Sequence, residues 1–244
     1  MKKRYLIKFS YDGTNFNGFQ KQKHDSNTVE ENMINALTYI NNKKYTKLVA
    51  SGRTDKKVHA LSQMAHFDLE VDITENKLKR ALNSLIREDI HVISVKEVDN
   101  SFHARYMVKE KTYIYKINMG EYNPLERNYI FQLCKKLDIK KIDEKISKFI
   151  GTHDFSFFCS NEDKKDNCIR TIYDVKTSIK DDILTISFTG NGFLRNMVRI
   201  MVGYLIDVGL NKEVKDIDEL FKEKRRSKVK TINPEGLYLY NVKY

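Results

Sequence analysis

The segment YLIKFSYDG, residues 5–13, decides how the first part of this chain folds. Its apolar side chains recur at every second position: Tyr5, Ile7, Phe9 and Tyr11. Successive side chains of a β-strand point to opposite faces of a sheet, so this alternation predicts a half-buried strand. The pair Asp12-Gly13 predicts a turn at the end of that strand.

A helix is predicted after this strand and its loop. Thr28 and Glu31 have the spacing of a capping box, and apolar residues follow at helical intervals as far as Ile40. Beyond it, the pattern predicts strands at 47–51 and 63–69, a helix at 78–85 and a strand at 90–98. The first half is therefore predicted to follow the order β-α-β-β-α-β.

The second half gives a similar mixture. Strands are predicted at 111–118, 169–179, 183–189 and 237–242, and helices at 143–150, 194–206 and 216–224. The segments IKFSYDGTNFNGF and ISFTGNGF each run from an alternating strand into a Gly/Asn turn, which leaves duplication open beside chance similarity. We expect an α+β fold of two similar halves, each with a mostly antiparallel sheet and helices on one side, and a cleft between the halves.

The net positive charge of the chain indicates which classes of binding partner are favoured. The 244 residues include 44 Lys plus Arg and 33 Asp plus Glu, which gives a formal net charge of +11. Because each neutralised phosphate releases counterions, this surplus favours nucleic acid or another polyanion; a lysine-rich surface that keeps the protein soluble is the alternative.

The cysteines and the distribution of apolar residues indicate the cellular compartment of the protein. The three cysteines have neither disulfide nor zinc spacing, which indicates reduced thiols in a cytoplasmic protein. The N-terminus fails as a signal peptide because its apolar residues alternate with polar ones. The apolar segment 193–210 carries two arginines and an aspartate, so no membrane-spanning segment is expected.

Several common motifs are excluded. Gly190-Asn191-Gly192 lies between a predicted strand and a predicted helix, as in the dinucleotide-binding fingerprint. Arg195 stands where that fingerprint needs Gly or Ala, so nicotinamide binding is not expected. The six histidines have no metal-ligand spacing, and the sequence lacks the motifs of phosphate-binding loops, serine hydrolases and zinc proteases. We therefore expect no metal site.

The segment SGRTDKKVH, residues 51–59, is the first candidate for chemistry. It places Arg53 and Asp55 in a tight polar loop after a strand. Asp55 there is either an ordinary turn residue that accepts backbone N–H groups, or an ionised carboxylate held by guanidinium groups and able to act as nucleophile or base.

Two further candidates lie in the second half. Tyr113, in the strand at 111–118, is either a core ring or a stacking surface for an unpaired base. Arg195 and Arg199 are four residues apart on one face of the apolar helix, where they either bind an anionic substrate or reach solvent. The basic run 222–230 is a candidate phosphate-binding surface or a solvated face.

Six motifs, taken in order, resemble those of the tRNA pseudouridine synthase A family over the whole chain. They are Tyr11-Asp12-Gly13 with Gly18-Phe19-Gln20, Gly52-Arg53-Thr54-Asp55 with Val58-His59-Ala60, Phe102-His103-Ala104-Arg105 followed by Tyr113, Gly151-Thr152-His153-Asp154-Phe155, Phe193 with Met197-Val198-Arg199 and Gly203, and Pro234-Glu235-Gly236-Leu237-Tyr238-Leu239. Any one of these motifs is weak, whereas six in sequence are specific.

The resemblance implies a pseudouridine synthase fold in two parts. Residues 1–104 would carry the catalytic loop, and residues 105–244 would complete a basic active-site cleft. It implies an isomerase that converts uridine to pseudouridine in the anticodon stem-loop of tRNA, at positions 38 to 40. It also implies a homodimer that needs no metal or cofactor.

The resemblance also assigns roles to residues. Asp55 would be the catalytic carboxylate, and Tyr113 would stack on the target base and help remove its C5 proton. Arg199 would pair with Asp55. Arg53 would hold the target nucleotide out of the stack, and Leu237 would pack against the base from the other side.

The sequence departs from the family pattern in two places. Lys56-Lys57 follows Asp55 where Ala-Gly is usual, which removes a glycine's conformational freedom, and Phe19 replaces tryptophan. We expect these changes to alter target preference or efficiency rather than chemistry. Two alternatives stay open: a non-catalytic RNA-binding protein of the same fold, and an enzyme acting on another structured RNA.

Overall fold

The computed structural model describes residues 2–160, 167–223 and 229–244, and it divides into two compact units. Unit 1 comprises Met1–Lys109 and Leu239–Tyr244, and unit 2 comprises Glu110–Tyr238. Part of the basic run at 222–230 lies outside the described residues.

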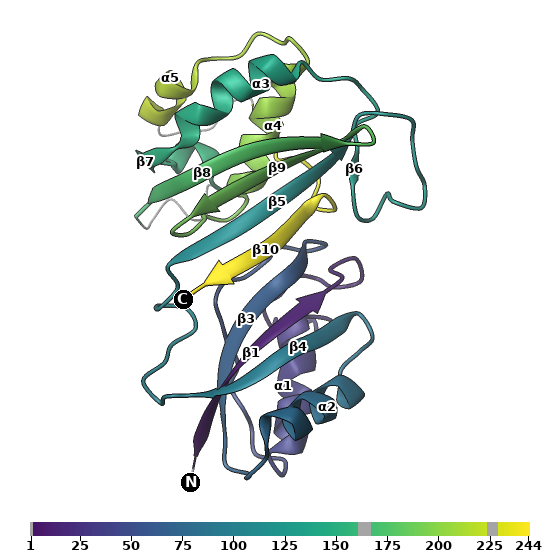
Figure 1. Ribbon diagram of the computed structural model, residues 1–244, viewed down its shortest axis with the longest axis vertical. Coiled ribbons are helices and arrows are strands. Elements are labelled where there is room, and N and C mark those ends of the chain that lie inside the picture. Colours follow the sequence, from purple (N-terminus) through teal and green to yellow (C-terminus); the bar gives the residue numbers. More distant parts are fainter. Residues whose placement is uncertain (1, 161–166, 224–228) are drawn as a thin grey trace. The chain divides into compact units, whose positions relative to one another are not determined.

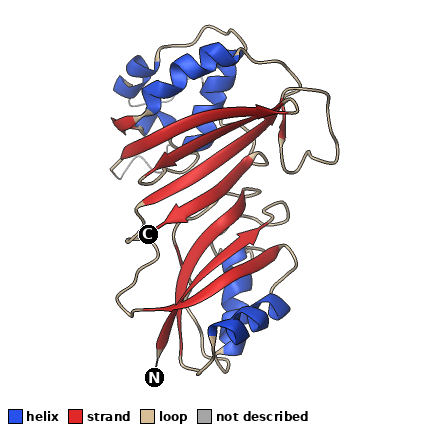
Figure 2. Ribbon diagram, in the orientation of Figure 1, coloured by secondary structure: helices blue, strands red, loops and turns tan. Residues whose placement is uncertain are grey.

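Unit 1 is built on three long antiparallel strands, and α1 and α2 cover one face of the sheet (Figures 1 and 2). The strand order is β4-β1-β3, and β2 pairs with β3. The elements are β1 (Lys3–Tyr11), α1 (Val29–Ile40), β2 (Val49–Ala50), β3 (His59–Leu69), α2 (Glu75–Leu85) and β4 (Ile90–Val98). The predicted order β-α-β-β-α-β is confirmed.

The local signals in unit 1 act as the sequence indicates. All four alternating side chains of β1 are buried, because every second residue faces the helices. Thr28 is the N-cap of α1, and its Oγ1 accepts from the Glu31 N–H at 3.3 Å. The β1–β3 register shifts between Phe9 and Tyr11, so the strand is irregular where it approaches the 51–59 loop.

Unit 2 has its own antiparallel strands in the order β5-β9-β8-β7, with β6 parallel to β5 and helices on one face (Figures 1 and 2). The strands are β5 (Glu110–Asn118), β6 (Phe131–Gln132), β7 (Gly151–Asp154), β8 (Ile169–Lys180) and β9 (Ile183–Gly190). The helices are α3 (Ile139–Ile146), α4 (Met197–Gly209) and α5 (Ile217–Lys222), with 3₁₀ turns η1 (Ser147–Phe149) and η2 (Ser156–Phe158). The α+β class with mostly antiparallel sheets is confirmed.

The core of unit 2 forms around α4. Nearly every α4 residue is buried, as its continuous apolar sequence requires. Phe149, Phe158 and Tyr204 meet edge to face, and His153 stacks on Phe221 with ring centroids 4.3 Å apart. This aromatic cluster ties α4 and α5 to the turns that precede β8.

The two units of the structure differ from the two parts predicted from the sequence, 1–104 and 105–244, because the C-terminal strand β10 (Leu237–Lys243) is shared between the units. Leu237 and Tyr238 belong to unit 2, but the rest of β10 belongs to unit 1. There the Lys109 N–H donates to the carbonyl oxygen of Lys243 at 2.9 Å. The C-terminal residues therefore pack with the first unit, although they are far from it in sequence.

Several predicted boundaries are wrong. The strand expected at 63–69 begins at His59, and the helix expected at 78–85 begins at Glu75. The helix expected at 194–206 begins at Met197, and the helix expected at 143–150 is α3 with a 3₁₀ turn after it. The strand expected at 47–51 is only Val49–Ala50. Sequence patterns missed β6 and β7, because segments of two to four residues show too few repeats to reveal a period.

Candidate active-site residues

Asp55 lies in the loop between β2 and β3 and is partly exposed. Its carbonyl oxygen accepts from the Val58 N–H at 3.2 Å, which closes a tight turn over residues 55–58. The neighbouring Thr54 is fixed twice: its Oγ1 lies 2.8 Å from the hydroxyl of Tyr11, and its carbonyl oxygen accepts from the Phe19 N–H at 3.0 Å. The candidate carboxylate therefore stands on a rigid section of loop.

Buried polar side chains extend this support to the start of the loop. Gln63 donates from Nε2 to the Gly52 carbonyl oxygen at 3.0 Å and accepts at Oε1 from the Ser51 hydroxyl at 2.8 Å. Burial raises the pKa of Tyr11 to about 12, so its hydroxyl stays protonated and able to hydrogen-bond at neutral pH.

The turn after β1 packs directly against the other end of the loop. A Cβ on Gly13 would lie 2.1 Å from the carbonyl oxygen of Val58, so only glycine fits. The Gly13 N–H donates to Nδ1 of the buried His59 at 3.0 Å. Asp12 Oδ1 is also 3.2 Å from that nitrogen. The buried His59 ring thus links the turn after β1 to the start of β3.

Lys56-Lys57, which replaces the Ala-Gly pair usual in the family, places a lysine at a backbone position that favours glycine. Lys57 has φ 64°, in the left-handed region that glycine adopts without strain. A non-glycine residue there costs roughly 1–2 kcal/mol. Lys57 thus takes a glycine-like conformation inside the Asp55–Val58 turn, and both lysines are exposed.

Arg53 is exposed, and its Nη1 donates to Oε1 of Gln20 at 2.6 Å. Gln20 belongs to the loop that also supplies the Phe19 contact to Thr54. Arg53 and Asp55 are the two candidate residues that lie in unit 1.

Tyr113 and Leu237 belong to unit 2. Tyr113 lies on β5 opposite Phe188 of β9, and its ring meets Phe193 edge to face at 5.1 Å. Only 8% of Tyr113 is exposed. Leu237 is buried at the start of β10, after Gly236, whose carbonyl oxygen accepts from the Lys116 N–H of β5 at 2.9 Å. Both side chains are therefore anchored through β5.

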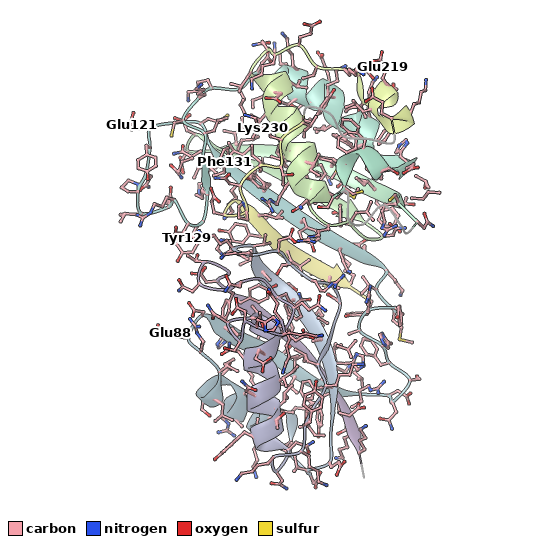
Figure 3. The ribbon with its side chains drawn as sticks, turned by 180° about the vertical axis from the view of Figure 1, so that it is seen from behind. Glu88, Glu121, Tyr129, Phe131, Glu219 and Lys230 are labelled. Atoms are coloured by element: carbon pink, nitrogen blue, oxygen red, sulfur yellow. The ribbon has the colours of Figure 1, made fainter. Side chains whose placement is uncertain are left out.

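Arg199 is partly buried in the first turn of α4. Its Nε donates to the Ile232 carbonyl oxygen at 2.7 Å, and its Nη1 donates to Oδ1 of Asn196 at 2.9 Å. Ile232 lies on the segment 229–236, which passes close to α4 at Lys230 (Figure 3). A Cβ on Gly203 of α4 would be 2.3 Å from the Lys230 carbonyl oxygen.

The predicted arrangement of Arg195 is wrong. Arg195 precedes α4, is exposed, and does not share a helix face with Arg199. The reason is Asn196 between them, whose φ of 61° breaks the helical path before Met197. The argument from two aligned arginines is therefore lost, and substrate binding by Arg195 stays a prediction.

The candidates divide between the units: Arg53 and Asp55 lie in unit 1, and Tyr113, Arg195, Arg199 and Leu237 lie in unit 2. The meeting of Asp55 with Tyr113 and Arg199 stays a prediction. Sequence reasoning gave no role to Asn196, Ser160 or the Ile232 carbonyl, because nothing in their local pattern marks them.

Within the described residues, no three His, Cys, Asp or Glu side chains gather as a metal-binding set. The same part of the chain contains no helix with the length and apolar character needed to span a membrane.

The chain is similar to proteins of one known family over most of its length. The profile of the tRNA pseudouridine synthase family matches residues 7–107 and 146–244. A protein from Limosilactobacillus reuteri called tRNA pseudouridine synthase A is 41% identical over 249 residues, covering 99% of this chain and 96% of that protein. Proteins of the same name from Anoxybacillus flavithermus and Listeria monocytogenes are 38% and 41% identical, and each alignment covers 99% of both chains.

A chain in the structure titled "Crystal Structure of a Cbf5-Nop10-Gar1 Complex" is 14% identical, with a TM-score of 0.37 over 84% of this chain and 45% of that one.

Proposed function

The chain belongs to the tRNA pseudouridine synthase family, an isomerase family acting on tRNA, and we propose that it converts uridine to pseudouridine at positions 38 to 40 of the anticodon stem-loop. The observation that carries this proposal is the match to tRNA pseudouridine synthase A proteins at about 40% identity over nearly the full length of both chains. The net charge of +11 suits a tRNA substrate.

The reaction is an isomerisation and balances without a co-reactant. The C1′–N1 glycosidic bond breaks, the uracil turns while it stays bound, and C5 bonds to C1′. C5 then loses its proton, and N1 gains one. A carboxylate serves this chemistry by trapping or stabilising the electron-poor C1′ or by attacking the ring. We propose Asp55 for that carboxylate.

The support for Asp55 is its setting in unit 1. The loop carrying it is held by the Tyr11–Thr54 and Gln63–Gly52 hydrogen bonds, which is the kind of rigid mounting that a catalytic group requires. The glycine-like φ of Lys57 supports retention of activity despite the departure from the family pattern.

The remaining roles rest on the family resemblance and on local geometry. Tyr113 stacks on the target base and helps to remove the C5 proton, and Arg199 pairs with Asp55. Arg53 holds the nucleotide out of the stack, and Leu237 packs on the other side of the base. Extruding a base costs a few kcal/mol, which these aromatic and apolar contacts offset.

We further propose that the enzyme works in the cytoplasm as a homodimer, without a metal or cofactor. Light scattering of the purified protein tests the dimer: a mass near twice 28.8 kDa is expected. A monomer at working concentration would contradict it.

A tRNA modification assay tests the function. Unmodified tRNA transcripts are incubated with wild type and Asp55→Asn, pseudouridine is mapped at single-nucleotide resolution, and tRNA binding is measured separately. We expect product at positions 38 to 40 with wild type, and none with Asp55→Asn, which should still bind.

Two outcomes would favour the alternatives. Binding by wild type with no product would indicate a non-catalytic RNA-binding protein of the same fold. Product only on another structured RNA would indicate a different substrate. Turnover by Asp55→Asn would remove Asp55 from the catalytic role.

A further inference from the structure

The Arg199 guanidinium is held from two directions by unit 2. Ile232 accepts from Nε at 2.7 Å, and Asn196 accepts from Nη1 at 2.9 Å. A guanidinium is planar and carries five N–H donors in a fixed fork. Contacts at two different nitrogens therefore set the orientation of the whole plane.

Asn196 is itself held by Ser160. Its Nδ2 donates to the Ser160 hydroxyl at 2.7 Å, and the Ser160 N–H donates to the Arg195 carbonyl oxygen at 3.2 Å. The amide oxygen of Asn196 thus serves Arg199, and its nitrogen serves Ser160. Rotation of the amide would break both bonds, so Ser160 keeps the acceptor turned toward the guanidinium.

The backbone at Asn196 is also unusual. Asn196 is the N-cap of α4, but it has φ 61° and ψ 1°, and its side chain makes no capping hydrogen bond. An N-cap asparagine ordinarily has extended backbone and accepts from the first turn of its helix. Here the Asn196 side chain accepts from Arg199 and not from the backbone N–H groups of the first turn of α4. Stabilisation of the helix therefore does not explain why an asparagine stands at this position.

We propose that Asn196 is a positioning residue, which presets the Arg199 guanidinium for the catalytic carboxylate while Ser160 fixes the Asn196 amide. The inference rests on the proposed function, in which Arg199 pairs with Asp55. A preset guanidinium loses less conformational freedom when the ion pair forms, so the productive geometry is more populated. Asn196 acts through Arg199, so its loss should affect turnover more than tRNA binding.

The substitution Asn196→Gly isolates the side chain. Glycine adopts a positive φ without strain, so the start of α4 should be retained while the amide is removed. We expect kcat to fall about ten-fold to one-hundred-fold, the range for one hydrogen bond to a charged group, with the tRNA Kd and the KM within about two-fold of wild type.

Asn211→Gly is the matched control. Asn211 is an exposed asparagine in unit 2 with φ 59°, just after α4, and it should tolerate glycine without change in kcat. Ser160→Ala tests the second contact: kcat should fall by less than in Asn196→Gly, and the double variant should be no worse than Asn196→Gly alone.

The outcomes separate this inference from the proposed function. If Asp55→Asn is inactive but Asn196→Gly keeps kcat within two-fold of wild type, positioning by Asn196 is refuted. An increase in KM with unchanged kcat, or additive losses in the double variant, would also refute it. Turnover by Asp55→Asn, or none by wild type, would instead refute the proposed function.

Discussion

The contact between Gly13 and Val58 allows a quantitative prediction for Gly13→Ala. The new methyl group would lie 2.1 Å from the Val58 carbonyl oxygen and 2.6 Å from its carbon, and both are backbone atoms that cannot rotate away. An ordinary non-bonded contact lies well beyond 3 Å, so the 12–14 turn and the loop must separate by roughly 1 Å or more.

That displacement reaches Asp55. The Val58 N–H bonds to the Asp55 carbonyl oxygen at 3.2 Å, and Thr54 is tied to Tyr11 on the same strand as the displaced turn. A misplacement of about 1 Å at a catalytic group can cost on the order of a hundred-fold in rate, which corresponds to about 2.7 kcal/mol. Overpacking should also lower the free energy of unfolding by about 1–3 kcal/mol.

The assay is release of tritium from tRNA labelled at C5 of uridine, since that hydrogen is lost in the reaction, with unfolding followed in urea. Gly192→Ala is the control, because the atom nearest to its added Cβ would be Arg170 Nε at 3.8 Å. If Gly13→Ala matches wild type in both kcat and stability, the argument that backbone contact positions the loop is wrong.

Three further predictions concern other positions. Lys57→Gly should keep activity and stabilise by under about 1 kcal/mol, because relief of the left-handed strain is largely offset by glycine's greater freedom in the unfolded chain. Lys57→Val should destabilise, because a β-branched residue resists φ 64°; equal urea midpoints for these two variants would contradict this. Gly203→Ala should lower the melting temperature more than Gly209→Ala, because the first meets a backbone carbonyl oxygen at 2.3 Å and the second a flexible side-chain end at 2.8 Å; the reverse order would refute it. Burial lowers the pKa of His66 from its usual value near 6.5 to about 4. Between these pH values the unfolded chain binds a proton that the folded chain does not, so the free energy of unfolding should fall by up to about 3 kcal/mol as pH decreases from 6.5 toward 4. His66→Gln should flatten that part of the pH–stability curve, and an unchanged slope would argue against this reasoning.

The local elements could be derived from the sequence because their signals are local. Alternation in β1 and the N-cap at Thr28 operate over a few residues, and the structure confirms both. The reciprocal bond of a full capping box is not formed, because the Glu31 carboxylate binds Lys21 and the Thr28 N–H donates to the Ser26 carbonyl oxygen. The six ordered motifs likewise predicted the family that the comparisons confirm. Backbone period and capping depend on neighbours in the chain, so a single sequence contains them.

The setting of the candidate side chains was decided by tertiary structure. Arg199 is oriented by a carbonyl oxygen 33 residues away and by an asparagine whose left-handed backbone also moves Arg195 off the helix. The end of β10 joins unit 1 although it lies more than a hundred residues beyond it in the chain. Such contacts depend on which distant backbone groups approach one another. Because a backbone carbonyl oxygen is the same acceptor in every residue type, no sequence pattern shows which carbonyl group will bind Arg199.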